Sequence, residues 1–362
     1  MGFFSRKKKE ENSTPITTNP KGFFELEVKE IKKLTPESVQ VSFKISDELK
    51  STFNFIPGQY LNLSSIIGGL EERRSYSICS GVDEDLAVAI KRINNGKFSN
   101  WANDILKVGD LVKVAAPLGN FKLDENSKNI VAFAAGSGIT PIISMAKNLA
   151  QSGGKLNLFY GNRSLNSIMF KSEFDSLSNV AVTHYLSGEK IENQREGRLD
   201  KDAISAIIKE DLGLLKADGF YLCGPETMIK SAIDTLTLFG VPKSKIHYEL
   251  YTTPVLLIEE SAVENIDFEG ESRIKVLLDE EEFEIKLNSS GKTILDAINK
   301  EGYDAPYSCR GGVCCTCKAK VLKGKVNMNL NYSLTDQEVA DGYILTCQAH
   351  PASEEVTISY DA

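Results

Sequence analysis

The chain has 362 residues and a net charge of -8, with 41% hydrophobic and 25% charged residues. This length and composition predict two or three domains of ordinary globular type. The negative charge argues against general nucleic-acid binding, and no apolar run reaches the ~18 residues of a membrane span. Seven cysteines do not make a secreted disulfide scaffold. We therefore expect a cytoplasmic protein with no stable membrane insertion.

The first 22 residues carry a basic cluster, Arg6-Lys7-Lys8-Lys9, followed by a stretch rich in Asn, Ser, Thr and Pro. No apolar segment follows the cluster, so this is not a secretory signal. Residues 1–22 are predicted to form a flexible tail. Weak contact with an anionic membrane is the alternative.

Residues 23–124 show short apolar-polar alternation, for example at 24–28 and 39–43, which is typical of half-buried strands. Turn pairs such as Pro57-Gly58 separate these runs. The segment therefore predicts a small antiparallel β-barrel.

Inside this segment lies the tetrapeptide Arg74-Ser75-Tyr76-Ser77. Here the chain resembles the ferredoxin–NADP reductase family, whose flavin-binding barrel carries an R-x-Y-S motif. In that role Arg74 would pair with a flavin phosphate, and Tyr76 would stack on the isoalloxazine ring. The Ser77 hydroxyl would reach flavin N5.

Gly96 and Ser99 precede a helical pattern at residues 101–106. Ser99 is a candidate N-cap, and a helix N-terminus is a ready anion site. The resemblance assigns Gly96 and Ser99 to the flavin pyrophosphate. This favours FAD, with FMN as the alternative.

In residues 125–251 the spacing of apolar residues no longer follows the strand alternation of the first segment. A continuous apolar run at 129–135 predicts a buried parallel strand, and a helical stretch at 142–151 and a second strand at 156–160 complete a βαβ unit. The segment is therefore predicted to be an α/β nucleotide-binding domain with a parallel sheet.

Gly136, Gly138 and Thr140 follow the first of these strands. The two glycines would let the backbone approach a pyrophosphate, and Thr140 stands where a helix could start. Pro141 replaces the third glycine of the dinucleotide fingerprint. The resembling family uses this G-x-G-x-x-P form; an ordinary strand–helix turn is the alternative.

The second strand is followed by Arg163, where an NAD enzyme tends to place an acidic residue for the ribose. Arg163 could hold a 2′-phosphate, with Arg198 as a second cation. The pattern favours NADPH, with NADH as the alternative. A pair of solvated surface arginines is the other interpretation.

A strand at 219–222 runs into Cys223-Gly224-Pro225. In the resembling family this turn lies beside the nicotinamide, whereas chemistry alone also allows a structural buried cysteine. Glu249 corresponds to the acidic residue that approaches the flavin in the family's closing segment. The resemblance therefore makes Ser77, Cys223 and Glu249 the catalytic candidates.

Residues 252–271 are Glu-rich and predict an interdomain linker. In residues 272–362, two strands at 273–278 and 283–287 flank a turn at 279–282. A helix at 294–300 and strands at 319–321 and 356–360 complete a ferredoxin-like β-grasp domain.

Four cysteines in this last domain follow the plant-type spacing C-x4-C-x2-C with a distant fourth thiol, and they are Cys309, Cys314, Cys317 and Cys347. Small residues between the first two leave backbone N–H groups free to point at cluster sulfurs. Cys315 lies outside the pattern and is predicted to be a packed, unligated thiol. A zinc site, although its usual second C-x2-C knuckle is missing, and unligated thiols are the alternatives. The spacing predicts a [2Fe–2S] cluster.

From residue 271 onward the chain has 15 acidic and 10 basic residues, a net of -5. This asymmetry would steer the domain toward a basic surface on a partner. A solvated acidic surface without a partner is the alternative.

The order of flavin barrel, nicotinamide domain and [2Fe–2S] domain resembles the reductase components of multicomponent oxygenases. The likeness is greatest to the reductases of phenylacetyl-CoA epoxidase complexes. It implies an NAD(P)H-dependent oxidoreductase that passes electrons one at a time to a partner oxygenase. A steroid hydroxylase, a desaturase or a hybrid-cluster protein is an alternative acceptor, and a non-turnover redox sensor is the rival class.

Overall fold

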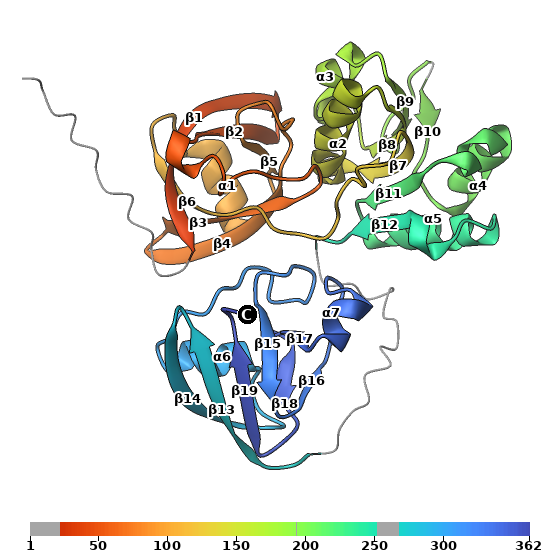
Figure 1. Cartoon of the computed structure of the whole chain (residues 1–362). Coiled ribbons are helices and arrows are strands. Elements are labelled where there is room, and N and C mark those ends of the chain that lie inside the picture. Colours follow the sequence, from red (N-terminus) through yellow and green to blue (C-terminus); the bar gives the residue numbers. More distant parts are fainter. Residues whose placement is uncertain (1–21, 193, 252–267) are drawn as a thin grey trace, which may run out of the picture.

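The computed structural model describes residues 22–192, 194–251 and 268–362. Figure 1 shows three bodies: an N-terminal barrel and an α/β domain side by side, and a C-terminal domain beneath the barrel. No helix in these ranges is long and apolar enough to cross a membrane. The predicted tail, except for Gly22, and most of the predicted linker fall outside the described residues.

The barrel is a six-stranded antiparallel sheet with the order β4-β3-β6-β1-β2-β5, as predicted from the alternation. Alternate residues such as Val28, Val41 and Leu61 are fully buried in its core. Its elements are β1 (Phe23–Thr35), β2 (Ser38–Lys44), β3 (Tyr60–Ile67), β4 (Leu70–Ser77), β5 (Ala87–Lys91), α1 (Lys97–Asp104) and β6 (Leu111–Ala115).

The prediction that Ser99 caps the helix is wrong. Helix α1 begins at Lys97, and its N-cap is Gly96, which has extended backbone angles. Ser99 is buried in the first turn, where its hydroxyl donates to the Gly96 carbonyl and accepts from the Ile93 N–H. The serine therefore ties the turn before the helix to its first residues instead of capping it.

The α/β domain has a parallel six-stranded sheet with the order β10-β9-β8-β7-β11-β12. The predicted apolar strand is confirmed, since residues 130–134 are completely buried. Helix α2 starts earlier than the predicted residue 142, because a proline is tolerated in the first turn of a helix. The elements are β7 (Asn129–Ala135), α2 (Ile139–Ser152), β8 (Lys155–Asn162), α3 (Lys171–Ser176), β9 (Val180–Leu186), β10 (Arg195–Glu196), α4 (Lys201–Glu210), β11 (Gly219–Cys223), α5 (Glu226–Leu238) and β12 (Ile246–Glu249).

The C-terminal domain is built on a five-stranded sheet with the order β14-β13-β19-β15-β17, as a β-grasp requires. Strand β13 pairs antiparallel with β14 and parallel with β19. The elements are β13 (Glu271–Leu278), β14 (Glu281–Asn288), α6 (Ile294–Lys300), β15 (Lys318–Lys323), β16 (Val326–Met328), α7 (Asp336–Ala340), β17 (Tyr343–Leu345), β18 (Ala349–Pro351) and β19 (Glu355–Ser359).

The predicted turn at 279–282 is too long. Leu278 pairs directly with Glu281, so only Asp279 and Glu280 form the turn, and both have positive φ. The Asp361 carboxylate accepts hydrogen bonds from both of their backbone N–H groups. This side chain, remote in sequence, holds a turn that the local residues would not favour.

Candidate functional site

The R-x-Y-S residues lie on β4, beside helix α1. The ring of Tyr76 is 5.7 Å from that of Phe98 in α1, so the helix that carries Gly96 and Ser99 packs against the motif strand. Arg74 is about half exposed, and its guanidinium donates to the Glu72 carboxylate at 3.0 Å. The structure therefore brings the predicted flavin-binding residues of the barrel together.

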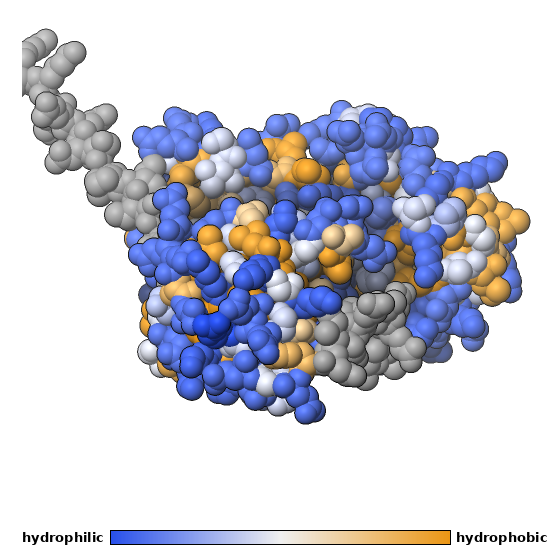
Figure 2. All heavy atoms as spheres, turned by 60° about the horizontal axis from the view of Figure 1, so that its bottom comes forward, coloured by the Kyte–Doolittle hydropathy of each residue, from blue (hydrophilic) through white to orange (hydrophobic). Residues whose placement is uncertain are grey.

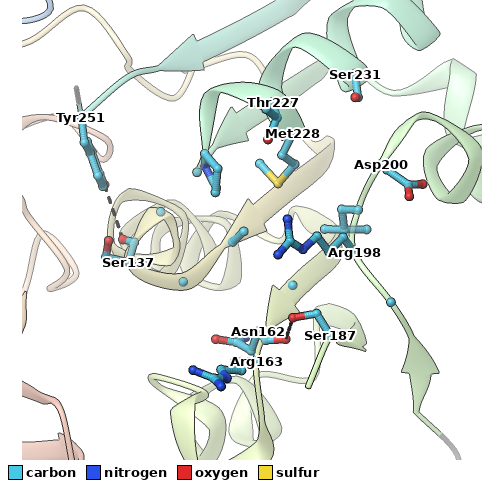
Figure 3. Close-up of a pocket in the computed structure, with 18 of the residues that line it drawn as sticks. Ser137, Asn162, Arg163, Ser187, Arg198, Asp200, Thr227, Met228, Ser231 and Tyr251 are labelled. Atoms are coloured by element: carbon cyan, nitrogen blue, oxygen red, sulfur yellow. Dashed lines mark hydrogen bonds between the residues drawn. The ribbon is translucent and has the colours of Figure 1, made fainter. Parts of the chain in front are cut away.

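A pocket of about 900 Å³ opens at the carboxyl ends of β7, β8 and β11 (Figure 3). The barrel contributes Lys91 and Ile93 to its wall, so the pocket lies where the two domains meet. The predicted residues among those that line it are Gly136, Gly138, Arg163, Arg198, Gly224 and Pro225.

Gly138 is required by a close approach of two turns. A Cβ atom at this position would lie 2.0 Å from the Cys223 carbonyl oxygen and 2.8 Å from the Gly224 nitrogen. Because both neighbours are backbone atoms, no side chain can move aside. The absence of a side chain lets the turn after β7 and the turn after β11 form one continuous pocket floor.

The pocket carries two exposed guanidinium groups. Arg163 follows β8 and Arg198 precedes α4, and Figure 3 shows both at the pocket. Within the described ranges, neither lies within ion-pair distance of a carboxylate. Asp200, the acidic residue in the lining, is engaged as the N-cap of α4, where it accepts from the Ala203 N–H at 3.0 Å. Both arginines are therefore available to an anionic ligand.

Side chains from both domains converge where the barrel meets the pocket. Ser77 Oγ donates to Glu249 Oε2 at 3.0 Å and lies 3.0 Å from the Tyr251 hydroxyl. The Tyr251 hydroxyl is also 3.1 Å from Thr140 Oγ1. These bonds join a barrel strand, the start of α2 and the segment after β12 into one network.

Cys223 completes this cluster, because it ends β11 directly beside Glu249 in the sheet. Burial and the neighbouring Glu249 carboxyl raise the pKa of the Cys223 thiol well above its ordinary value. Burial also raises the pKa of Glu249 to about 8, against the opposing hydrogen bond from Ser77. The structure thus brings together the three predicted catalytic candidates, and both acids are held in their protonated forms at neutral pH.

Sequence reasoning missed Tyr251. Figure 3 shows its ring reaching toward Ser137, and its hydroxyl bonds Ser77 and Thr140. The available signal was the closing segment at 247–251, in which the resemblance expects an aromatic residue beside the acidic one, and Tyr251 is an aromatic residue of that segment.

The four predicted cluster cysteines form two adjacent pairs, Cys309 with Cys314 and Cys317 with Cys347. Three of them are at most 5% exposed. Contact with Cys314, aided by backbone N–H donors and opposed by burial, lowers the pKa of Cys309 below its ordinary value. In the described residues, no three ligand-type side chains converge on one point as a single metal ion would need.

The loop between these cysteines is shaped around their sulfur atoms. Arg310 and Gly312 have positive φ, and the Gly311 N–H points at Cys309 Sγ at 3.4 Å. The Thr316 hydroxyl donates to Cys314 Sγ at 3.3 Å. Buried thiols that receive such donors fit a [2Fe–2S] cluster.

Cys315 behaves as the sequence predicted for a thiol outside the ligand set. It is partly buried, and its thiol donates to the Ser333 carbonyl at 3.3 Å.

Three family models match successive parts of the chain. They describe an oxidoreductase FAD-binding domain at residues 17–123, an oxidoreductase NAD-binding domain at 133–234 and a 2Fe-2S iron-sulfur cluster binding domain at 276–352. Their order is the order of the three bodies in the fold.

Curated relatives match almost the whole chain. It is 35% identical to a component of the 1,2-phenylacetyl-CoA epoxidase of Escherichia coli (strain K12), covering 94% of this chain and 98% of that one. It is 32% identical to the 3-ketosteroid-9-alpha-monooxygenase ferredoxin reductase component of Mycobacterium tuberculosis, covering 93% and 96%. It is 28% identical to NADH oxidoreductase HCR of Escherichia coli (strain K12), covering 91% and 96%.

Solved structures share the three-part fold at lower identity. Phthalate dioxygenase reductase aligns with a TM-score of 0.57 and 23% identity, covering 94% of this chain and all of that one. An intact type IV self-sufficient cytochrome P450 monooxygenase aligns with a TM-score of 0.69 and 23% identity, covering 93% of this chain and 41% of that one. These likenesses establish the fold.

Proposed function

Since the chain belongs to the ferredoxin–NADP reductase-like oxidoreductases with FAD-binding, NAD-binding and C-terminal [2Fe–2S] domains, we propose that it transfers electrons from NADPH to a partner oxygenase. One observation carries this proposal. Tyr251 lines the nucleotide pocket and its hydroxyl lies 3.0 Å from Ser77 Oγ on β4. Ser75, two residues earlier on the same strand, lies 2.7 Å from the hydroxyl of Ser308, which directly precedes Cys309. Strand β4 therefore adjoins both the nucleotide pocket and the cysteine loop.

When bound, the nicotinamide supplies two electrons as a hydride, the flavin accepts two and releases them singly, and the [2Fe–2S] cluster carries one. The chain's own groups position these cofactors. Gly136, Gly138 and the Gly224 turn open the floor of the pocket to a dinucleotide. Ser77 and Glu249, joined by a hydrogen bond at the junction of the two domains, would offer a hydroxyl and a protonated carboxyl to the flavin and the nicotinamide.

We assign the nicotinamide as NADPH. The support is the pair Arg163 and Arg198 at the pocket, together with the lack of an acidic residue directly after β8. A guanidinium fork matches a 2′-phosphate, whereas NAD enzymes favour a carboxylate for the free ribose hydroxyl. The FAD assignment is supported by the FAD-binding family match and by helix α1 beside the R-x-Y-S strand.

The acceptor in this proposal is an oxygenase of the phenylacetyl-CoA epoxidase type, as suggested by the 35% identical relative. A steroid monooxygenase is the second candidate, favoured by the 32% identical relative. The face of the [2Fe–2S] domain that comes forward in Figure 2 is largely hydrophilic, with small, separated apolar areas. Together with the domain's net negative charge, this favours a polar docking surface on a basic partner. Four cysteines assigned to a cluster and three others that form no disulfide favour a reducing cytoplasm.

The test uses the full chain loaded with FAD and its cluster. NADPH oxidation is measured with ferricyanide, with cytochrome c, and with purified oxygenase components from both candidate systems, each at low and high salt. We expect salt-sensitive product formation with the phenylacetyl-CoA oxygenase. Turnover with the steroid oxygenase alone would make that oxygenase the acceptor in place of the phenylacetyl-CoA type. Failure to oxidise NADPH with any acceptor would refute the proposed function.

A further inference from the structure

The β3–β4 hairpin of the barrel is covered on both faces. Leu61 and Leu63 of β3 face the barrel core and are 0% and 1% exposed. The alternate residues Asn62 and Ser64, which point the other way, are just as buried at 0% and 1%. Polar residues on the outer face of a barrel are normally solvated. Here the [2Fe–2S] domain lies beneath β3 and β4 (Figure 1) and covers them.

Hydrogen bonds link this polar face to the cysteine loop and the residue before it. Asn62 Nδ2 donates to Thr316 Oγ1 at 2.9 Å, and the Cys315 N–H donates to the Tyr60 hydroxyl at 3.1 Å. The hydroxyls of Ser75 and Ser308 are 2.7 Å apart. The contact therefore fixes the position of the loop itself and not merely of the domain around it.

A buried arginine lies at the same interface. The Arg73 side chain is 1% exposed, and its Nη2 donates to both carboxylate oxygens of Asp304, at 3.1 and 3.0 Å, across the domain boundary. The same atom donates to Glu71 on its own strand at 2.8 Å. The guanidinium also lies 4.8 Å from the centre of the Tyr307 ring, two residues before Cys309. Asp304 and Tyr307 are thus the residues of the [2Fe–2S] domain that compensate the buried positive charge of Arg73.

We propose that Arg73 is the positioning residue that holds the [2Fe–2S] domain on the β3–β4 face, in register for electron transfer from the flavin. Its neighbour Arg74 points to the other side of the same strand, toward the predicted flavin phosphate. One strand thus holds the cluster domain with Arg73 and would hold the flavin with Arg74. This inference rests on the proposed function, and it adds the residue that sets the geometry between two of its cofactors.

The docked arrangement is coupled to the charge on Asp304. Removing the Asp304 charge leaves the 1% exposed Arg73 guanidinium with the Glu71 carboxylate and without its partner from the [2Fe–2S] domain, so the docked state loses stability. The undocked state does not incur this penalty, because water then solvates Arg73. Neutralising Asp304 should therefore reduce the docked fraction while leaving both domains folded.

The test compares Asp304→Asn with Asp296→Asn in the loaded full chain. Asp296 is a matched control, because it lies in the same domain and is similarly exposed, 39% against 30%. Its partner Arg310 also stacks on the Tyr307 ring, at 4.3 Å, but the pair does not cross between domains. Asp304→Glu keeps the charge and serves as the conservative rescue.

The first readout is structural and independent of turnover. The Nδ2 atom of Asn120, in the barrel, lies 3.9 Å from the Cys315 sulfur. A cysteine placed there by Asn120→Cys can form a disulfide with Cys315 when the domains are docked, and this disulfide traps the docked state. We expect Asp304→Asn to slow trapping, measured by peptide mass spectrometry, by about tenfold. Asp296→Asn, in the same Asn120→Cys background, should form the disulfide at the rate measured for Asn120→Cys alone.

The second readout is stopped-flow absorbance after mixing with NADPH. Asp304→Asn should slow cluster reduction by about tenfold and leave ferricyanide reduction unchanged, and Asp304→Glu should restore most of the rate. Parent-like trapping and cluster reduction in Asp304→Asn would overturn the proposal. Equal losses in Asp296→Asn, or loss of iron from Asp304→Asn, would also overturn it. Loss of ferricyanide reduction in the unmutated chain would instead refute the proposed function.

Discussion

Replacing Arg163 by alanine removes one of the two guanidinium groups assigned to the 2′-phosphate. A hydrogen bond to a charged group contributes about 1.5–3 kcal/mol. Arg163 is solvent-exposed, so water screens the pair and the lower end applies. About 1.4 kcal/mol corresponds to tenfold in an equilibrium constant. We therefore expect Arg163→Ala to raise KM for NADPH about tenfold and to leave KM for NADH within about twofold.

The assay is steady-state ferricyanide reduction with each nucleotide at low ionic strength. Arg195→Ala is the matched control, because Arg195 is exposed nearby but pairs with Glu210 and does not line the pocket. This control should leave both KM values unchanged. Equal increases for NADPH and NADH in Arg163→Ala would refute the phosphate assignment, and so would an NADPH-selective effect of Arg195→Ala.

Three further outcomes are expected. Cys347→Ser should abolish the cluster's visible absorbance yet keep NADPH-driven ferricyanide reduction; loss of both would make the cluster structural for the whole chain. Gly138→Ala should lower the free energy of unfolding by about 1–3 kcal/mol and weaken nucleotide binding, because its Cβ would meet the Cys223 backbone. The control is Gly81→Ala, whose Cβ would have nothing nearer than 3.5 Å and which should leave the melting temperature unchanged. Equal shifts of the melting temperature in the two variants would contradict the prediction. The raised pKa keeps Glu249 protonated below about pH 8, so the rate of flavin reduction should change with pH around pH 8. Glu249→Gln should abolish this pH dependence. If the variant keeps the same pH dependence, Glu249 is not the group that titrates.

Local patterns predicted the features that are encoded locally. The apolar run of β7 reports on neighbouring residues, and the structure confirms the strand. The cysteine spacing and the turn at Cys223 are local signals too, and the structure pairs Cys309 with Cys314 and ends β11 at Cys223. The position of the helix N-cap was wrong, because a serine is the commoner cap and the extended backbone of Gly96 was not visible in the sequence.

Contacts between distant residues were beyond such reasoning. Arg73 and Asp304 are 231 positions apart, and the sequence offers only an arginine beside a known motif. The two-residue turn before β14 depends in the same way on Asp361, 81 positions after Glu280. In both cases the decisive partner comes from another part of the fold, so no local period or spacing signals it.

The central claim is that electrons pass from NADPH through the flavin to the [2Fe–2S] cluster within this chain. Anaerobic titration of the loaded protein with NADPH, followed by visible absorbance and EPR, tests it most directly. We expect the flavin band to bleach together with the appearance of a rhombic, plant-type [2Fe–2S] signal. Bleaching of the flavin without that signal, in protein that contains its iron, would contradict the route.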